Sequence, residues 1–79
     1  MTWNESDGAL NAVLTFADFA EAFAFMTRVG LIAQEQGHHP DMSISWNQVT
    51  IRITTHDAGN TLTDKDRKLA AAIEALGAA

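Results

Sequence analysis

The stretch Val49-Thr-Ile-Arg-Ile-Thr54 alternates apolar and polar side chains without a break. Because successive side chains of a β-strand point to opposite faces, this alternation predicts a strand with one buried and one exposed face. A sheet that is covered on one face only is typically antiparallel. The neighbouring sequence therefore has to supply further strands and a cover for the buried face.

Three more strands are predicted before this one. Ile44 and Trp46 share a face of the directly preceding strand, which places Trp46 in the core, and the turn between the two strands begins at Trp46. Two short strands are expected at residues 3–6 and 10–15. The dipeptide Asp7-Gly8 between them suits a two-residue hairpin turn, because both positions tolerate positive φ.

An amphipathic helix is predicted after the second strand. Thr15 with Asp18 resembles a capping box at its start, and Gly37 is the expected stop. Its apolar side chains recur at steps of three and four and cover about half the helix circumference, which is more than one sheet face needs. Part of this face is therefore expected to contact another subunit. The two apolar rows are Phe16, Phe19, Phe23, Met26, Gly30 and Ala33, and Ala22, Phe25, Val29 and Ile32.

A second helix is predicted from Thr63, with an acid, Asp66, three residues later, to a stop at Gly77. An apolar stripe between Leu69 and Leu76 is narrow, so this helix needs only one partner surface. The order of elements is then β-β-α-β-β-α. The predicted fold is a single α+β domain over residues 1–79, with a four-stranded antiparallel sheet and the helices packed on one face.

Composition narrows the classes of function. The chain has 79 residues, a formal net charge of −5 and no cysteine. The lack of cysteine excludes disulfides, thiol catalysis and cysteine-based zinc sites. A core this small favours self-association. The negative charge argues against a nucleic-acid partner, because the one basic cluster lies at 65–68. No apolar run approaches the roughly 20 residues that span a bilayer, and no signal peptide is evident, so a cytoplasmic protein with no membrane partner is expected.

All three histidines lie between positions 38 and 56. His38 and His39 follow the predicted first helix, and His56 follows the clearest strand, so a helix end and a strand end are expected to meet at one edge of the sheet. Histidine titrates near neutral pH, and three imidazoles without cysteine or a serine-based motif favour proton transfer over covalent catalysis. The chain has no glycine-rich phosphate loop, so no nucleotide cofactor is expected.

Other interpretations of these residues stay open from the local sequence. Adjacent histidines before Pro40 suit a helix C-terminus, where an imidazolium interacts favourably with the helix dipole. The three histidines with Asp41 and Asp57 also resemble a metal site, although adjacent ligands are not the usual helical arrangement. Asp66 by itself is explained by capping of the second helix.

Four segments resemble the pterin-4a-carbinolamine dehydratases (4a-hydroxytetrahydrobiopterin dehydratases) in order and spacing. They are Glu35-Gln-Gly-His-His-Pro-Asp41, Trp46-Asn47, Ile53-Thr-Thr-His-Asp-Ala-Gly59 and Leu62-Thr-Asp-Lys-Asp66. The resemblance runs from about Trp3 to Leu76. It implies a lyase that dehydrates 4a-hydroxytetrahydrobiopterin to quinonoid dihydropterin in tetrahydropterin recycling, with no metal or organic cofactor. It also implies a homodimer that extends the sheet, or a homotetramer that packs through helices.

The resemblance also implies roles for individual residues. We expect His38 and His56 to carry the acid–base steps and His39 to position the pterin ring, so that all three histidines are catalytic. Asp66 is expected to orient His56 as well as to cap its helix. The alternative function is a family-derived interaction or assembly factor without catalysis. The substrate-binding residues that the resemblance implies are Pro40, Trp46, Asp57 and Asp66.

The chain departs from the family pattern in three places. Many members carry an acid four residues before the first histidine, where this chain has Gln34. The loop Gly59-Asn-Thr-Leu62 is one residue longer than the commoner form. The helix that usually precedes the residue corresponding to Trp3 is expected to be missing, which leaves more apolar surface for association to cover.

Overall fold

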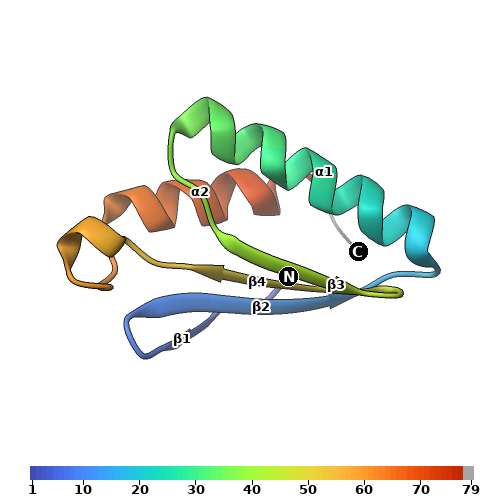
Figure 1. Cartoon of the computed structure of the whole chain (residues 1–79), viewed down its shortest axis with the longest axis horizontal. Coiled ribbons are helices and arrows are strands. Elements are labelled where there is room, and N and C mark those ends of the chain that lie inside the picture. Colours follow the sequence, from blue (N-terminus) through green and yellow to red (C-terminus); the bar gives the residue numbers. More distant parts are fainter. Residues whose placement is uncertain (78–79) are drawn as a thin grey trace.

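The computed structural model describes residues 1–77, which form a four-stranded antiparallel sheet with two α-helices on one face (Figure 1). This confirms the predicted α+β fold and the β-β-α-β-β-α order. The elements are β1 (Asn4–Ser6), β2 (Ala9–Thr15), α1 (Phe19–Gln36), β3 (Asp41–Ser45), β4 (Gln48–Ile53), the 3₁₀ turn η1 (His56–Ala58) and α2 (Asp64–Glu74).

β4 lies inside the sheet, whose strand order is β1-β2-β4-β3. Val49, Ile51 and Ile53 are each 0% exposed, as the alternation predicts. On β2, Leu10 pairs with Ile53 and Leu14 with Val49, so apolar side chains of the two central strands form one continuous floor beneath the helices. Burial of this floor supplies the main driving force for the fold.

The turn between β1 and β2 has the left-handed backbone that the Asp7-Gly8 dipeptide predicts. Asp7 has a φ of 52° and Gly8 a φ of 71°. Ser6 pairs with Ala9, so these two residues alone form the turn. A turn of this kind matches the right-handed twist of the strands on either side.

α1 begins later than predicted, because Thr15 still belongs to β2 and pairs with Gln48. The predicted capping box at Thr15 is therefore wrong. Asp18 caps the helix instead, and its Oδ1 accepts a hydrogen bond from the Glu21 N–H at 2.9 Å. The pairing of Thr15 with the neighbouring strand decides where the helix can start.

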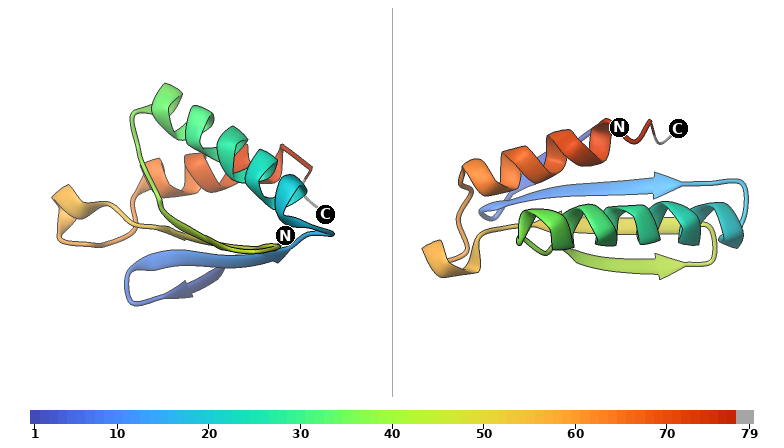
Figure 2. Two further views of the ribbon diagram at one scale, coloured as in Figure 1. Left: turned by 45° about the vertical axis from the view of Figure 1, so that its right-hand side comes forward. Right: turned by 90° about the horizontal axis from the view of Figure 1, so that it is seen from above.

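One apolar row of α1 packs on the sheet, and the second row is buried only in part. Phe19 and Phe23 are 47% and 53% exposed, and their rings stack with centroids 5.6 Å apart. α1 and α2 lie side by side over the same face of the sheet (Figure 2). The buried residues of α1 are Ala22, Phe25, Val29 and Ala33.

Trp46 does not lie in the core, contrary to the prediction. Ser45 pairs with Gln48, so Trp46 and Asn47 alone form the turn between β3 and β4. Trp46 has a φ of 49° and is 66% exposed. The strand that contains Ile44 ends one residue before Trp46, and the alternation does not continue into the turn.

α2 ends earlier than predicted, at Glu74 with Ala75 as its C-cap, rather than at Gly77. Its apolar stripe is buried as predicted, with Leu69 and Ile73 each 0% exposed. Within residues 1–77, no helix is both long enough and apolar enough to cross a membrane.

Candidate active site

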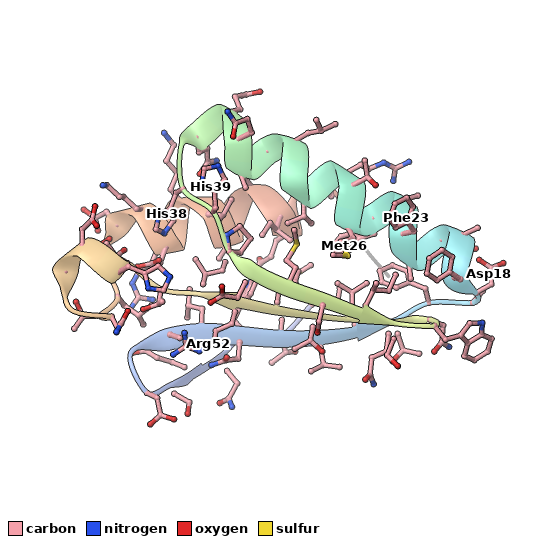
Figure 3. The ribbon with its side chains drawn as sticks, viewed as in Figure 1. Asp18, Phe23, Met26, His38, His39 and Arg52 are labelled. Carbon is pink, nitrogen blue, oxygen red and sulfur yellow. The ribbon has the colours of Figure 1, made fainter. Side chains whose placement is uncertain are left out.

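The three histidines meet at one end of the molecule, around a pocket of about 210 Å³. His38 and His39 lie in the link between α1 and β3 (Figure 3), and His56 begins η1 just beyond β4. The ends of a helix and of a strand thus supply the imidazoles. The other lining residues are Gly37, Thr55, Asp57 and Lys65.

Gly37 sets the direction in which the two adjacent histidines leave α1. Its φ of 66° is left-handed, as expected for a helix stop at glycine. The Gly37 N–H donates to the Gln34 carbonyl at 3.2 Å, and the His38 N–H donates to the Ala33 carbonyl at 3.1 Å. This pair of bonds is a Schellman motif. The backbone of His38 therefore caps the helix, while its side chain stays available for another contact.

The side chain of His38 reaches the buried carboxylate of Asp66. Nε2 and Oδ1 are 2.6 Å apart, and the two side chains are 13% and 0% exposed. The second oxygen of Asp66, Oδ2, accepts hydrogen bonds from the Thr55 hydroxyl and from the Thr63 N–H, both at 2.7 Å. Since Thr63 is the N-cap of α2, Asp66 caps that helix as predicted and also holds a histidine.

The surroundings of Asp66 favour its charged form. Burial alone would raise the pKa of this carboxyl, but hydrogen bonds from His38, Thr55 and Thr63, together with the charge of His38, outweigh burial and lower the pKa below its usual value. A carboxylate accepts hydrogen bonds and donates none, so the shared proton belongs to Nε2 of His38. Nδ1 is then the nitrogen of His38 that is left for a ligand.

Asp66 makes no hydrogen bond to His56, contrary to the expectation that it orients this residue. Nδ1 of His56 lies 2.8 Å from Oδ1 of Asn60 instead. His56 belongs to η1, beyond the end of β4, and turns toward the exposed loop that follows it. The position beside Asp66 is occupied by His38.

His39 is exposed and pairs with Gln34 in the last turn of α1, with 2.9 Å between Nε2 and Oε1. The three imidazoles therefore have different partners, a buried carboxylate for His38 and neutral amides for His39 and His56. His38 and His39 keep Nδ1 for a ligand, and His56 keeps Nε2. Such a set can give and take protons at separate points of one bound molecule.

The other predicted binding residues are not all brought to the pocket. Asp57 lines it, together with Lys65. Pro40 follows His39 in the link to β3 and is not one of the lining residues. Trp46 lies in the β3–β4 turn, at the opposite end of the sheet from η1 (Figure 1). The chain does not place Trp46 near its own histidines.

The sequence does not identify the side chains of Thr55, Asn60 or Lys65 as parts of the site, although the backbone around Thr55 is expected to lie near the pterin. A signal exists for Thr55, because it continues the buried alternation of β4. It is 6% exposed, and a hydroxyl buried in this way needs a hydrogen-bond partner. No comparable local signal marks Asn60, whose contact with His56 depends on the path of the loop.

No group of three or more histidine or acidic side chains within residues 1–77 is arranged to hold a metal ion. The two acids of the metal interpretation lie in different places. Asp41 faces Arg52 on the neighbouring strand, with 3.9 Å between Oδ2 and Nη1, whereas Asp57 lines the pocket. Each of the three histidines is engaged with its own side-chain partner.

The chain is similar in sequence to one protein family and to named members of it. The family described as Pterin 4 alpha carbinolamine dehydratase matches residues 1–76. A Rhizorhabdus wittichii protein, named provisionally as a pterin-4-alpha-carbinolamine dehydratase, is 53% identical over 76 residues, which cover 94% of this chain and 77% of the relative. A Synechococcus sp. (strain WH7803) protein with the same provisional name is 50% identical over 74 residues, which cover 94% of this chain and 78% of the relative.

Two solved structures are similar to this one. The crystal structure of a transcriptional coactivator/pterin dehydratase from Brucella melitensis gives a TM-score of 0.87 at 33% identity, covering 98% of this chain and 82% of that chain. A pterin dehydratase-like protein identified as a RuBisCO assembly factor in the alpha-carboxysome gives a TM-score of 0.75 at 21% identity, covering 95% and 86%. The second likeness concerns the fold alone.

Proposed function

The chain belongs to the pterin-4a-carbinolamine dehydratase family, and from this membership we propose that it dehydrates 4a-hydroxytetrahydrobiopterin to quinonoid dihydropterin. The observation that carries the proposal is the meeting of His38, His39 and His56 around one pocket. Each imidazole is held by a separate side chain, so each can act at its own point of a bound ring. The quinonoid dihydropterin product then enters the route that regenerates tetrahydropterin.

The chemistry requires two proton transfers. The C4a–O and N5–H bonds break, a C4a=N5 double bond forms, and the oxygen leaves as water. Hydroxide is a poor leaving group, so an acid has to protonate the departing oxygen while a base accepts the N5 proton. General acid–base catalysis of this kind contributes roughly 10²–10⁴-fold, and imidazoles suit both steps near neutral pH. We assign these steps to His38 and His56, and positioning of the ring to His39.

The two acids of the site have different roles in this proposal. Asp66 is buried and bonded to His38, so it keeps that imidazole in one orientation and one tautomer. Asp57 is exposed at the pocket and offers its carboxylate to the amide and amine N–H groups along one edge of a pterin. Pro40 restricts the backbone of His39 and so supports the site indirectly.

We also propose that the chain is one domain that acts as a homodimer or homotetramer. One cluster of buried apolar residues joins the sheet to both helices, which supports a single domain. β1 and β3 are the edges of the sheet, and the stacked rings of Phe19 and Phe23 leave apolar surface on α1. Open edges and exposed apolar patches are surfaces that other chains cover.

An assay with chemically generated 4a-hydroxytetrahydrobiopterin tests the proposed activity. We expect the protein to form quinonoid dihydropterin faster than the spontaneous reaction does. His38→Ala and His56→Ala are each expected to lower kcat/KM by roughly 10²–10⁴-fold, because each removes a proton-transfer group. Lys68→Ala, on the exposed side of α2, is the control and should retain activity. Circular dichroism checks that the variants are folded.

Two results of this assay would contradict the proposal. One is a folded wild-type protein that does not accelerate dehydration, and the other is full turnover by both histidine variants. The first result would favour the second candidate function, a non-catalytic interaction or assembly factor. That candidate is supported by the exposed pair of Phe19 and Phe23, which offers an apolar contact surface away from the histidines.

A further inference from the structure

The loop between His56 and α2 contains a residue that holds one histidine of the site. Oδ1 of Asn60 lies 2.8 Å from Nδ1 of His56. Asn60 has a φ of 59°, a left-handed backbone that asparagine adopts more readily than most residues. This conformation turns the chain back after η1, and the side-chain amide of Asn60 then meets the imidazole.

The backbone of Asn60 is held on two sides. Its N–H donates to the Thr55 carbonyl at 3.1 Å, and a bridge between Thr55 and Thr61 closes the same loop. On the other side lies Gly8, where a Cβ atom would be 2.3 Å from the Asn60 carbonyl oxygen. The Thr54 hydroxyl donates to the Gly8 carbonyl at 2.7 Å and so fastens the β1–β2 turn to the end of β4. Tertiary contacts therefore set the position of Asn60.

From this geometry we infer that Asn60 is a positioning residue for His56. Its Oδ1 accepts the Nδ1–H proton, which selects one tautomer of the neutral imidazole and leaves Nε2 unprotonated. Histidine in water favours the other tautomer, with the proton on Nε2. The catalytic meaning of this contact rests on the proposed dehydration, in which Nε2 of His56 would accept the N5 proton. The amide of Asn60 fixes the ring without adding charge, in contrast to the carboxylate that holds His38.

Two substitutions separate the amide of Asn60 from its backbone. Asn60→Gly keeps the left-handed conformation and removes the acceptor, whereas Asn60→Asp keeps an acceptor oxygen in the same place. Asp7→Gly is the matched control, because Asp7 is a second exposed residue with positive φ and its side chain bonds to Ser6. The ¹⁵N chemical shifts of the His56 imidazole, recorded without substrate, report which ring nitrogen carries the proton.

We expect a protonated Nδ1 on His56 in the wild type, Asn60→Asp and Asp7→Gly, and a shift toward protonated Nε2 in Asn60→Gly. In the dehydration assay, Asn60→Gly should lower kcat roughly tenfold and change KM less than roughly twofold, a smaller loss than removal of the imidazole causes. The inference is overturned if Asn60→Gly and the wild type have equal tautomer populations, or if kcat of an active enzyme does not change. A wild type without activity would overturn the proposed function. The spectra need no substrate, so the tautomer populations of His56 would still test whether Asn60 positions this residue.

Discussion

Nε2 of His38 lies 2.6 Å from Oδ1 of Asp66, although the two residues are 28 positions apart in the chain. The contact joins the link after α1 to the first turn of α2. It also buries a carboxylate whose other oxygen caps α2 through the Thr63 N–H. One side chain therefore contributes to the stability of the fold and to the geometry of the candidate site.

Asp66→Asn keeps the size of the side chain and removes its charge. An amide cannot accept at both of its ends, so the bond from His38 or those from Thr55 and Thr63 are lost. We expect the free energy of unfolding at neutral pH to fall by roughly 1–3 kcal/mol, as for a buried group left unsatisfied. Urea denaturation measures this change. Asp64→Asn, on an exposed acid of the same turn, should change it by less than about 0.5 kcal/mol.

The lowered pKa of Asp66 predicts a specific acid dependence. The pKa of this carboxyl lies below its ordinary value of 3.8 in the folded protein, so the stability from its charge is fully present above that value. That stability is lost as the pH falls from 3.8 through the lower pKa of the folded state. The difference in unfolding free energy between the wild type and Asp66→Asn should narrow over this range. Urea denaturation at a series of pH values tests this, and a constant difference would contradict it.

Thr55→Val should destabilise the fold through lost hydrogen bonds. The Thr55 hydroxyl donates to Oδ2 of Asp66 and lies 2.7 Å from the Thr63 hydroxyl. Valine has nearly the same shape, so packing is kept and only the hydrogen bonds of the hydroxyl are lost. We expect the free energy of unfolding to fall by roughly 1–2 kcal/mol from this loss. Thr55→Ser keeps the hydroxyl and is the control in the same urea denaturation experiment. Equal losses in the two variants would assign the effect to packing instead.

Gly8→Ala should force the β1–β2 turn and the loop around Asn60 apart, because the added Cβ would lie 2.3 Å from a backbone oxygen. Gly59→Ala is a matched control, since Gly59 has a similar φ of 76° but no neighbouring atom within 4 Å of the added Cβ. In Gly59→Ala, backbone strain alone should lower the free energy of unfolding by roughly 1 kcal/mol. In Gly8→Ala, the clash should lower the free energy of unfolding by roughly 1–3 kcal/mol more, measured by urea denaturation. Equal decreases in the two variants would show that the β1–β2 turn accommodates the added Cβ without further loss of stability.

Phe23→Ser tests the proposed association through α1. Phe23 is 53% exposed and stacks with Phe19, so its removal should weaken a contact between subunits on this helix. We expect sedimentation velocity to show a shift toward a smaller species at equal protein concentration. Val13→Thr is the control, because Val13 is 61% exposed on the strand β2 rather than on a helix. An unchanged assembly of Phe23→Ser would show that α1 does not form the interface.

Alternation and turn residues predict most of the sheet, and they fail where a strand ends. The strand at 49–53 and the Asp7-Gly8 turn follow from local patterns. The start of α1 and the position of Trp46 do not. Thr15 at the end of β2 and Ser45 at the end of β3 both pair with Gln48 at the start of β4. The limits of both strands are therefore set by a partner strand, which no local pattern contains.

Local sequence was enough to identify the histidines, the glycine that ends α1 and the carboxylate that caps α2, because each depends on residues a few positions apart. It did not identify the partners of the imidazoles correctly. Asp66 reaches His38 rather than His56 because both helices pack on one sheet. The side-chain partner of His56 is Asn60 instead, because the loop that contains Asn60 is held against Gly8. A hydrogen bond forms only within about 3 Å, and distances this short between remote residues arise from packing.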